Sequence, residues 1–359
     1  MASFFDRMKS KKTTKVMTDS HVFQRKEIIN TELPILNIAF SGEVDGGLVP
    51  GLTVIAGPSK SFKSLLTLYC LKAFQDKYPD GAAIFYDCEY GITEDYMRMV
   101  GVDPDRVIYE EIESVEDLKF KIVKLLREEV ELGDKLFIMI DSIGNLASIK
   151  ELDDATNEKS VADMSRAKSL KSLFRMITPY LTKKSIPCIA INHIYMEMGL
   201  YPKAIVSGGT GIMYSANQVF IMGKSQIKDG TEIVGYDFTI NIEKSRFVRE
   251  KSKLPFTVLN NQGIQKWSSM FELAAESGFI EKPKVGWYTT IDPETGEVSP
   301  TNLRKAEIEK NDAFFNKLIK NDKFKEYVES KFKLGNGETN PSESDDINSQ
   351  IEAALGEDE

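Results

Sequence analysis

The stretch GPSKSFKS, residues 57–64, stands between the apolar run LTVIA (52–56) and a helical run that begins LLTLYCL. A glycine-bearing turn between a buried strand and a helix N-terminus points backbone N–H groups at one spot, and such a spot binds phosphate. The spacing predicts that Lys63 reaches the β- and γ-phosphates of a nucleotide and that the Ser64 hydroxyl binds Mg²⁺. The predicted nucleotide contacts are Gly57, Pro58, Ser59, Lys60, Ser61, Phe62, Lys63 and Ser64.

Phe62 departs from the usual form of this motif, which has a second glycine before the lysine. A bulky residue limits how closely the backbone wraps a phosphate, because only glycine adopts the required conformations freely. Taken alone, the stretch also fits a lysine-bearing turn without a ligand. Residues elsewhere in the chain therefore bear on the choice.

Two carboxylates end or follow apolar runs downstream of this stretch. Asp141 ends LFIMID (136–141), where a strand-end acid orders the magnesium ion of a phosphate-loop protein. Glu89 follows AAIFYD (82–87), at the carboxyl end of a strand, where open α/β sheets bind their ligands. We interpret Glu89 as the general base that orients the attacking water. Asp87 is the rival for this role, and a solvated loop acid is the alternative for either carboxylate.

His193 follows PCIAIN (187–192), again at the end of a strand run. A lone histidine is more often a structural residue than a functional one. Beside a γ-phosphate, however, an imidazole donates a hydrogen bond and reports hydrolysis to the next segment of the chain. That segment, residues 195–214, is glycine-rich and weakly patterned, and long loops inside compact domains are usually functional.

Apolar β-rich runs alternate with helical patterns over residues 50–225, which predicts an α/β fold with a mostly parallel sheet flanked by crossover helices. The predicted strands cover 52–56, 82–87, 136–141, 187–192 and 218–223, and the predicted helices cover 64–78, 115–132 and 161–184. Two runs with apolar–polar alternation, at 236–243 and 255–259, predict antiparallel strands that extend the sheet.

Changes in sequence texture predict four parts: an N-terminal segment (1–30), the main core (31–267), a small C-terminal domain (268–335) and a disordered acidic tail (336–359). The C-terminal domain combines short helical runs with a turn-rich stretch at 282–300. The net charge of −9 opposes nucleic-acid binding at first sight. The tail holds eight of the acidic residues and no Lys or Arg, however, so residues 1–335 carry a net charge of only −1.

The chain has no run of about 18 uncharged apolar residues, and its N-terminus is polar and Lys-rich, so we expect neither a membrane span nor a secretory signal. Three cysteines, Cys70, Cys88 and Cys188, are widely spaced and lie in apolar runs. We interpret them as buried thiols in a reducing cytoplasm.

Several motifs together resemble the RecA-like recombinases, most closely the UvsX recombinases of T-even-type bacteriophages. The motifs that carry the resemblance are LPILNIA (33–39), GPSKSFKS (57–64), FYDCEYGIT (85–93), IDSIGNLAS (140–148), AINHIY (190–195), SGGTG (207–211) and EKSR (243–246). The resemblance extends over roughly residues 30–265 and includes Phe62, so the missing glycine no longer argues against ATP. It implies a RecA-like P-loop ATPase core that binds ATP with Mg²⁺.

The resemblance also implies roles for individual residues. Lys63 and Ser64 would bind the phosphates and magnesium, Asp141 would order magnesium, and Glu89 would be the catalytic base. Tyr96 stands where this class stacks an aromatic ring on adenine; its alternative is a locally packed surface tyrosine. His193 stands where bacterial RecA has a glutamine that senses the γ-phosphate.

Two cations, Lys244 and Arg246, match the basic pair with which RecA reaches the ATP of the neighbouring subunit. Such cations stabilise transition-state charge only when subunits assemble. The alternative is charge alternation on the solvated face of a strand.

DNA-binding loops of this class follow the strands that end at Asp141 and Asn192, near 149–160 and 194–213. The second loop has a single cation. Its candidate DNA contacts are Met198, Lys203, Gly208 and Gly209.

The implied function is ATP-dependent strand exchange. Helical filaments form on single-stranded DNA and pair it with homologous duplex DNA in recombination, repair and recombination-dependent replication. The implied partners are both forms of DNA, other copies of the chain through the N-terminal segment, a phage single-stranded-DNA-binding protein and a loading protein, in the cytoplasm of an infected bacterium. The acidic tail resembles tails that tune access to duplex DNA.

Two other functions remain open at this point. A hexameric helicase shares the core but has a separate N-terminal assembly domain, whereas only about fifty residues precede the P-loop here. A non-catalytic recombinase paralogue would bind ATP as a structural clamp, and the intact Lys63, Glu89 and Asp141 argue against it.

Overall fold

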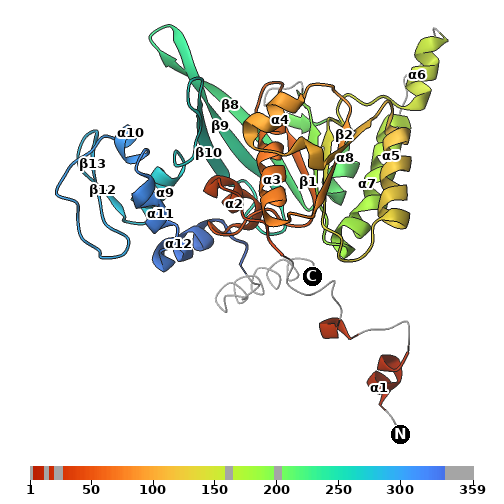
Figure 1. Ribbon diagram of the computed structural model, residues 1–359, viewed down its shortest axis with the longest axis horizontal. Coiled ribbons are helices and arrows are strands. Elements are labelled where there is room, and N and C mark those ends of the chain that lie inside the picture. Colours follow the sequence, from red (N-terminus) through yellow and green to blue (C-terminus); the bar gives the residue numbers. More distant parts are fainter. Residues whose placement is uncertain (1–2, 12–15, 20–26, 158–164, 198–203, 336–359) are drawn as a thin grey trace, which may run out of the picture.

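A computed structural model describes residues 3–11, 16–19, 27–157, 165–197 and 204–335 (Figure 1). Its main feature is a nine-stranded sheet with the order β11-β10-β9-β8-β1-β5-β4-β2-β3. The strands are β1 (Gly51–Ala56), β2 (Ala82–Asp87), β3 (Val107–Glu111), β4 (Leu136–Asp141), β5 (Pro187–Asn192), β8 (Gln218–Asp229), β9 (Glu232–Ser245), β10 (Lys253–Leu259) and β11 (Gly263–Gln265).

The sheet is parallel from β3 to β8 and antiparallel from β8 to β11, so the predicted mostly parallel α/β fold is confirmed. Three of the predicted strands agree with β2, β4 and β5 at both ends. Two strands of this sheet were missed. β3 has an exposed edge and little apolar periodicity, and β11 has only three residues.

Helices cover both faces of the sheet (Figure 1). Successive residues of one strand belong to different apolar clusters: Ile55 packs with one face and Val54 with the other, as the two-residue period of a strand requires. The first face carries α2 (Pro34–Ser41), α3 (Lys63–Lys77) and α4 (Glu94–Val100), and the second carries α5 (Val115–Lys124), α7 (Ser165–Lys183) and α8 (Thr210–Ser215). The helix predicted to run to residue 132 ends earlier, because α5 gives way to a π-helical turn at Leu125–Glu129.

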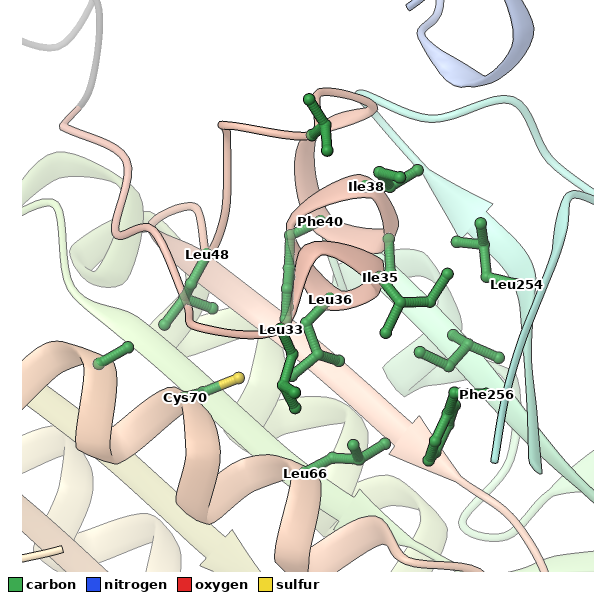
Figure 2. Packing of buried hydrophobic residues seen from close by; sticks show 14 of the residues in the cluster. Leu33, Ile35, Leu36, Ile38, Phe40, Leu48, Leu66, Cys70, Leu254 and Phe256 are labelled. Atoms are coloured by element: carbon green, nitrogen blue, oxygen red, sulfur yellow. The ribbon is translucent and has the colours of Figure 1, made fainter. Parts of the chain in front are cut away.

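Helix α2 is buried along its whole length between α3 and the antiparallel strands (Figure 2). Leu36 and Phe40 lie in the same apolar cluster as Leu66 of α3 and Phe256 of β10. The helix ends at Ser41 and is capped by Gly42, whose φ of 77° is a left-handed conformation that favours glycine. A Cβ on this glycine would lie 2.8 Å from the Cα of Lys333, so the end of the described chain packs directly against α2.

The C-terminal elements pack against the first face of the core. They are α9 (Met270–Glu276), the hairpin β12–β13 (Ile280–Lys284, Trp287–Thr290), α10 (Lys305–Ile308), α11 (Asp312–Leu318) and α12 (Asp322–Phe332). Trp267 is buried where this part joins the core and stacks on Phe315 with a centroid distance of 5.1 Å. The turn-rich interpretation of 282–300 missed the β12–β13 hairpin, because its outward positions are mostly polar.

The described N-terminal residues include helix α1 (Phe4–Lys9), which lies apart from the body of the molecule (Figure 1). It has no buried residue, and Phe4 and Phe5 are exposed. The acidic segment 336–359, predicted to be disordered, lies outside the described residues. In the part of the chain that the structure describes, no helix is both long enough and apolar enough to cross a membrane.

Cys70 and Cys188 are fully buried, as predicted, whereas Cys88 is only partly so. Burial raises the pKa of the Cys70 and Cys188 thiols well above the usual range. The cysteine at 88 follows the last residue of β2, where the strand leaves the sheet, and this explains its greater exposure.

Candidate nucleotide-binding site

A cleft of about 490 Å³ lies at the carboxyl edge of the parallel strands. It gathers residues from the P-loop, from the ends of β2, β4 and β5, from α4 and from the β8–β9 ribbon. The lining residues are Ser59, Lys60, Ser61, Phe62, Lys63, Ser64, Leu65, Glu89, Gly91, Ile92, Tyr96, Asp141, His193, Lys224, Tyr236 and Phe238. The residues that the sequence predicts to bind ATP within the same chain therefore line one cavity, apart from Gly57 and Pro58 at the start of the loop.

The backbone of the P-loop explains how Phe62 replaces a glycine. Phe62 has a φ of 68° and Lys60 a φ of 57°, so both are left-handed, and such turns create anion-binding concavities. The Phe62 ring packs on Phe238 of β9 with a centroid distance of 4.7 Å. The side chain thus turns away from the phosphate cradle and packs on the sheet.

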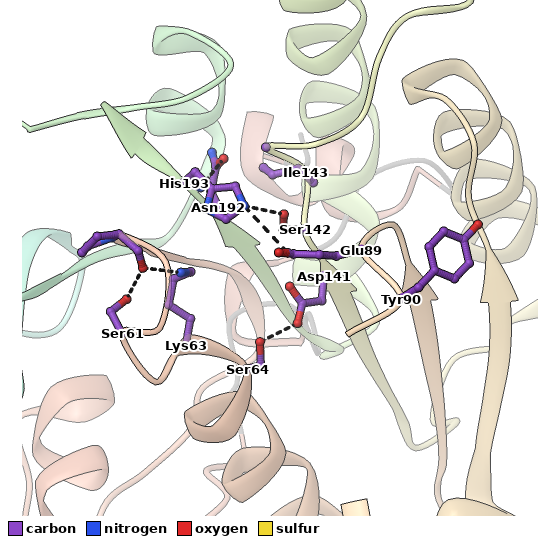
Figure 3. Close-up of polar contacts among 12 residues, drawn as sticks. Ser61, Lys63, Ser64, Glu89, Tyr90, Asp141, Ser142, Ile143, Asn192 and His193 are labelled. Carbon is purple, nitrogen blue, oxygen red and sulfur yellow. Dashed lines mark hydrogen bonds and ion pairs between the residues drawn. The ribbon is translucent and has the colours of Figure 1, made fainter. Parts of the chain in front are cut away.

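Lys63 is held inside the loop (Figure 3). Its Nζ donates to the carbonyl oxygen of Pro58 at 2.8 Å, and the Ser61 hydroxyl donates to the same oxygen at 2.7 Å. Burial lowers the pKa of the Lys63 ammonium, while Asp141 and Glu89 act in the opposite direction. A partly desolvated cation next to an open cleft favours an anionic ligand.

Ser64 and Asp141 meet at the bottom of the cleft (Figure 3). The Ser64 hydroxyl donates to Asp141 Oδ2 at 2.6 Å. The other oxygen, Oδ1, is buried and has no hydrogen-bond partner among the described residues. Burial, opposed by the Ser64 hydrogen bond, raises the pKa of Asp141 to about 6. A hydroxyl beside a buried carboxylate oxygen with free acceptor capacity fits the oxygen ligands that Mg²⁺ prefers.

Asp87 and Glu89 differ sharply in what they contact. Asp87 is buried; its Oδ1 accepts the backbone N–H groups of Glu89 and Tyr90 at 3.0 and 2.8 Å, and its Oδ2 accepts the Tyr109 hydroxyl at 3.3 Å. Glu89 is partly exposed and points into the cleft, with its Oε2 3.8 Å from His193 Nε2. Asp87 therefore holds the turn that presents Glu89.

His193 lies between Glu89 and Ser142, whose Oγ is 3.2 Å from the same Nε2. Burial and the Lys63 ammonium lower the pKa of His193, while Glu89 opposes them, so the imidazole is mostly neutral at pH 7. A Cβ on Gly144 would lie 2.6 Å from the imidazole Cδ2, so a side chain there would displace the ring.

The described residues after His193 contain secondary structure where a loop was predicted. They form the short hairpin β6–β7 (Ile194–Met196, Ala204–Val206) and then α8. The His193 carbonyl accepts the N–H of Ser207 at 2.9 Å, and the Asn192 amide donates to the Ser207 carbonyl at 2.8 Å. His193 is therefore tied by its backbone to both ends of this hairpin. The glycine-rich composition concealed the two short strands.

The candidate DNA contacts are only partly described. Met198 and Lys203 lie outside the described residues. Gly208 and Gly209 both have positive φ, 89° and 80°, immediately before α8, and a Cβ on Gly208 would lie 2.8 Å from Leu170 of α7. The first predicted DNA loop contains the helix α6 (Ile149–Thr156), started by a Ser148–Glu151 capping box, and the helix projects from the body (Figure 1).

Lys244 and Arg246 do not line the cleft of their own chain. Lys244 Nζ donates to the carbonyls of Met213 and Tyr214, near the end of α8, at 2.7 and 3.2 Å. Arg246 follows β9 at the sheet edge opposite the P-loop and lines a separate cavity with Lys333. The solvated-strand interpretation therefore does not describe Lys244, which binds helix carbonyls.

Six lining residues were missed by sequence reasoning: Leu65, Gly91 and Ile92, which lie near predicted site residues in the sequence, and Lys224, Tyr236 and Phe238, which lie far from them. Lys224 of β8 and Tyr236 and Phe238 of β9 form the wall of the cleft beside the P-loop. Tyr96 of α4, for which the resemblance implies an adenine contact, also lines the cleft and is partly buried. The strand alternation at 236–243 marked one face of β9, but no local pattern indicated that this face borders the P-loop.

Comparisons with known proteins agree with this geometry. Residues 9–265 match the RecA N-terminal domain, and residues 267–328 match the family described as "Bacteriophage T4, Recombination and repair protein, C-terminal domain". The chain is 46% identical over 348 residues to the recombination and repair protein of Enterobacteria phage T4, covering 95% of this chain and 89% of that protein.

Bacterial RecA proteins are more distant relatives. The chain is 26% identical to RecA of Ruegeria pomeroyi over 70% of this chain and 71% of that protein. It is 28% identical to RecA of Streptomyces rimosus over 76% of this chain and 70% of that protein. A strand-end carboxylate, a P-loop and the extended β8–β9 ribbon around one cleft, together with these matches, lead to one conclusion: the chain belongs to the RecA family of recombinases, ATPases that act on DNA, and is a UvsX-like member of it.

Proposed function

We propose that this recombinase binds ATP with Mg²⁺ in the cleft at the end of β1, and that ATP hydrolysis in this cleft controls its affinity for single-stranded DNA. The observation that carries the proposal is the Ser64–Asp141 pair, in which one buried carboxylate oxygen lacks a partner among the described residues. Removing an acceptor from water without a partner is costly. A cation held with the nucleotide supplies the missing partner.

In this proposal, Ser64 and Asp141 are the residues that would hold Mg²⁺, which when bound would supply positive charge beside the phosphates. Lys63 exchanges its Pro58 acceptor for the phosphates. The backbone of residues 57–64 cradles the same phosphates, and Tyr96 stacks on the base.

Glu89 is the proposed general base, because it is the cleft carboxylate with an open path to solvent, whereas both oxygens of Asp87 accept hydrogen bonds. His193 is the proposed γ-phosphate sensor. Lys244 and Arg246 are proposed to complete the ATP site of the next subunit, since neither lines its own cleft. Met198, Lys203, Gly208 and Gly209 are the proposed DNA contacts.

We further propose the division into an N-terminal assembly segment (1–30), an ATPase core (31–267), a small C-terminal domain (268–335) and an acidic tail (336–359). A single-stranded-DNA-binding protein and a loading protein of the same phage are the proposed accessory partners, in the cytoplasm of an infected bacterium. Exposed Phe4 and Phe5 on α1 support an assembly role for the first segment, because burying two neighbouring exposed aromatic side chains against another protein is favourable.

The substitution Lys63→Ala tests the site. We expect ATP turnover in the presence of single-stranded DNA to fall by about 10² or more, because the loop loses its side-chain cation for the phosphates. Lys72→Ala is the matched control, since Lys72 lies on the same helix but pairs with Asp76 outside the cleft. Full turnover in the Lys63 variant would refute the site.

A further inference from the structure

Lys224 of β8 is an exposed residue, yet its side chain contacts the P-loop. Its Nζ donates to the carbonyl oxygen of Lys60 at 3.0 Å, although the two residues are 164 positions apart. Met222, two residues earlier and on the same face of β8, packs against Gly57 so closely that a Cβ on the glycine would lie 2.8 Å from the Met222 Cβ. One face of β8 therefore contacts the P-loop at two points.

The hydrogen bond bears on the shape of the phosphate cradle. A peptide unit is planar and trans, so its C=O and N–H point in opposite directions. When the Lys60 carbonyl points at Lys224, the next N–H, that of Ser61, points away from Lys224. A loop that presents N–H groups to an anion needs its carbonyls turned outward in this way. Lys60 also has the left-handed φ of 57°, a conformation that costs a non-glycine residue free energy and needs support.

The ammonium group of Lys224 is itself held in place. It lies 3.9 Å from the centroid of the Tyr236 ring, within the range of a cation–π interaction. Lys224 pairs with Phe238 across the β8–β9 ladder, and Phe238 packs on Phe62 of the P-loop. The β8–β9 ribbon thus contacts two left-handed residues of the loop. The Lys224 ammonium binds the Lys60 carbonyl, and Phe238 packs on the Phe62 ring.

We propose that Lys224 is a positioning residue for ATP: it holds the Lys60–Ser61 peptide in the phosphate-binding orientation, with Tyr236 fixing its ammonium group. This inference rests on the proposed function, because it assumes that the P-loop cleft is the ATP site. It assigns Lys224 to ground-state binding of the nucleotide and gives it no part in the chemical step. Its loss therefore weakens nucleotide binding and leaves the turnover number nearly unchanged.

The test uses the full chain with Lys224→Met, which keeps the length of the side chain and removes the charge. The dissociation constant of a fluorescent ATP analogue is measured without DNA, and kcat and KM for ATP are measured with saturating single-stranded DNA. We expect the dissociation constant and KM to rise about fivefold, since a charge-assisted hydrogen bond at an exposed site is partly screened. We expect kcat to change by less than about twofold.

Four further variants separate positioning from a general effect on folding or charge. Lys224→Arg retains a donor and a planar group that stacks on Tyr236, so it should bind ATP within about twofold of the parent chain. Lys228→Met is the matched control, because Lys228 lies on the same strand but does not line the cleft. Tyr236→Leu should weaken binding, and the double variant with Lys224→Met should be no weaker than Lys224→Met alone, because the ring acts through the ammonium.

The inference is overturned if Lys224→Met binds the analogue as tightly as the parent chain, or if its kcat falls while its KM stays unchanged. These outcomes remain distinct from failure of the proposed function. An inactive Lys63→Ala with an unaltered Lys224→Met rejects the positioning role alone. A fully active Lys63→Ala rejects the ATP site itself.

Discussion

At the residue scale, Asp141 lies in surroundings that disfavour its charged form. Its ordinary pKa of 3.8 rises to about 6 in the folded chain, mainly through burial. Between these two pH values the folded state binds more protons than the unfolded state. Stability from this group is therefore present below about pH 4 and falls as the pH rises to about 6, with a total penalty of roughly 3 kcal/mol. A bound cation at the open Oδ1 offsets that penalty.

Asp141→Asn should accordingly stabilise the ligand-free protein. We expect a gain of about 1–3 kcal/mol in unfolding free energy at pH 7, because the amide keeps the shape and removes the buried charge, and a smaller gain near pH 4. Urea unfolding at both pH values measures it, with the exposed Asp95→Asn of α4 as the control. A loss of stability at pH 7 would show that the carboxylate is structural.

Glu89→Gln and Asp87→Asn distinguish the two carboxylates of the β2 end. The Glu89 variant should bind ATP and DNA normally and hydrolyse ATP about 10²-fold more slowly, because the amide retains the shape without a base. Asp87→Asn should instead lower the melting temperature, since its two oxygens hold the turn and Tyr109. If Asp87→Asn folds normally and has the deeper hydrolysis defect in a steady-state ATPase assay, the assignment is reversed.

At the scale of elements, the junction of β5 with the β6–β7 hairpin connects the cleft to a proposed DNA-binding segment. His193 occupies the junction. Its ring contacts Ser142 and Glu89 in the cleft, and its carbonyl oxygen accepts a hydrogen bond from the N–H of Ser207, the residue after β7. A ligand shifts an equilibrium only through contacts that differ between two states. The γ-phosphate is present in ATP and absent in ADP, and we propose that the His193 imidazole donates a hydrogen bond to it, which would supply such a contact.

His193→Ala should therefore retain ATP binding and lose the ATP-dependent gain in affinity for single-stranded DNA, a gain measured as the ratio of DNA dissociation constants with ADP and with ATP. We expect this ratio to fall at least about fivefold, the lower end of common coupling energies. His193→Gln should recover much of it, because the amide also donates. A melting curve checks folding, and a folded alanine variant with the full ratio would reject the sensor role.

At the scale of the whole molecule, Lys244 and Arg246 lie away from the cleft of their own chain, and we propose that they complete the ATP site of the next subunit in a filament. In this proposal, a complete site needs Glu89 from one subunit and Arg246 from its neighbour. Head-to-tail interfaces of this kind generate open helices when the rotation does not close. Arg246 lies at the end of the sheet opposite the P-loop, so in this proposal one subunit would present the two halves of a site on different faces.

Mixing two inactive proteins tests this arrangement. Arg246→Ala and Glu89→Gln should each be nearly inactive alone, yet an equal mixture on single-stranded DNA should recover about a quarter of the parent ATPase rate, because about one interface in four has both residues intact. A mixture of Glu89→Gln with Lys63→Ala is the control and should recover nothing, since both changes lie in the same cleft. No recovery in the first mixture would place Arg246 in cis.

The sequence by itself determined the central strands and the cis residues of the candidate site. Buried parallel strands are apolar on both faces, so β2, β4 and β5 stand out as continuous runs, and the candidate site residues follow directly at their ends. Each of these signals is local. The family resemblance extended the same interpretation to His193 and to the basic pair.

Other features were decided only by the tertiary structure. β3 and the β12–β13 hairpin were missed because exposed strands lack continuous apolar runs. Lys224 and Tyr236 were missed for a different reason: the strand order places β8 beside β1, and so brings residues 164 positions apart into hydrogen-bonding contact. No periodicity within either segment records that pairing, because it depends on which strands become neighbours when the two faces of the sheet are buried.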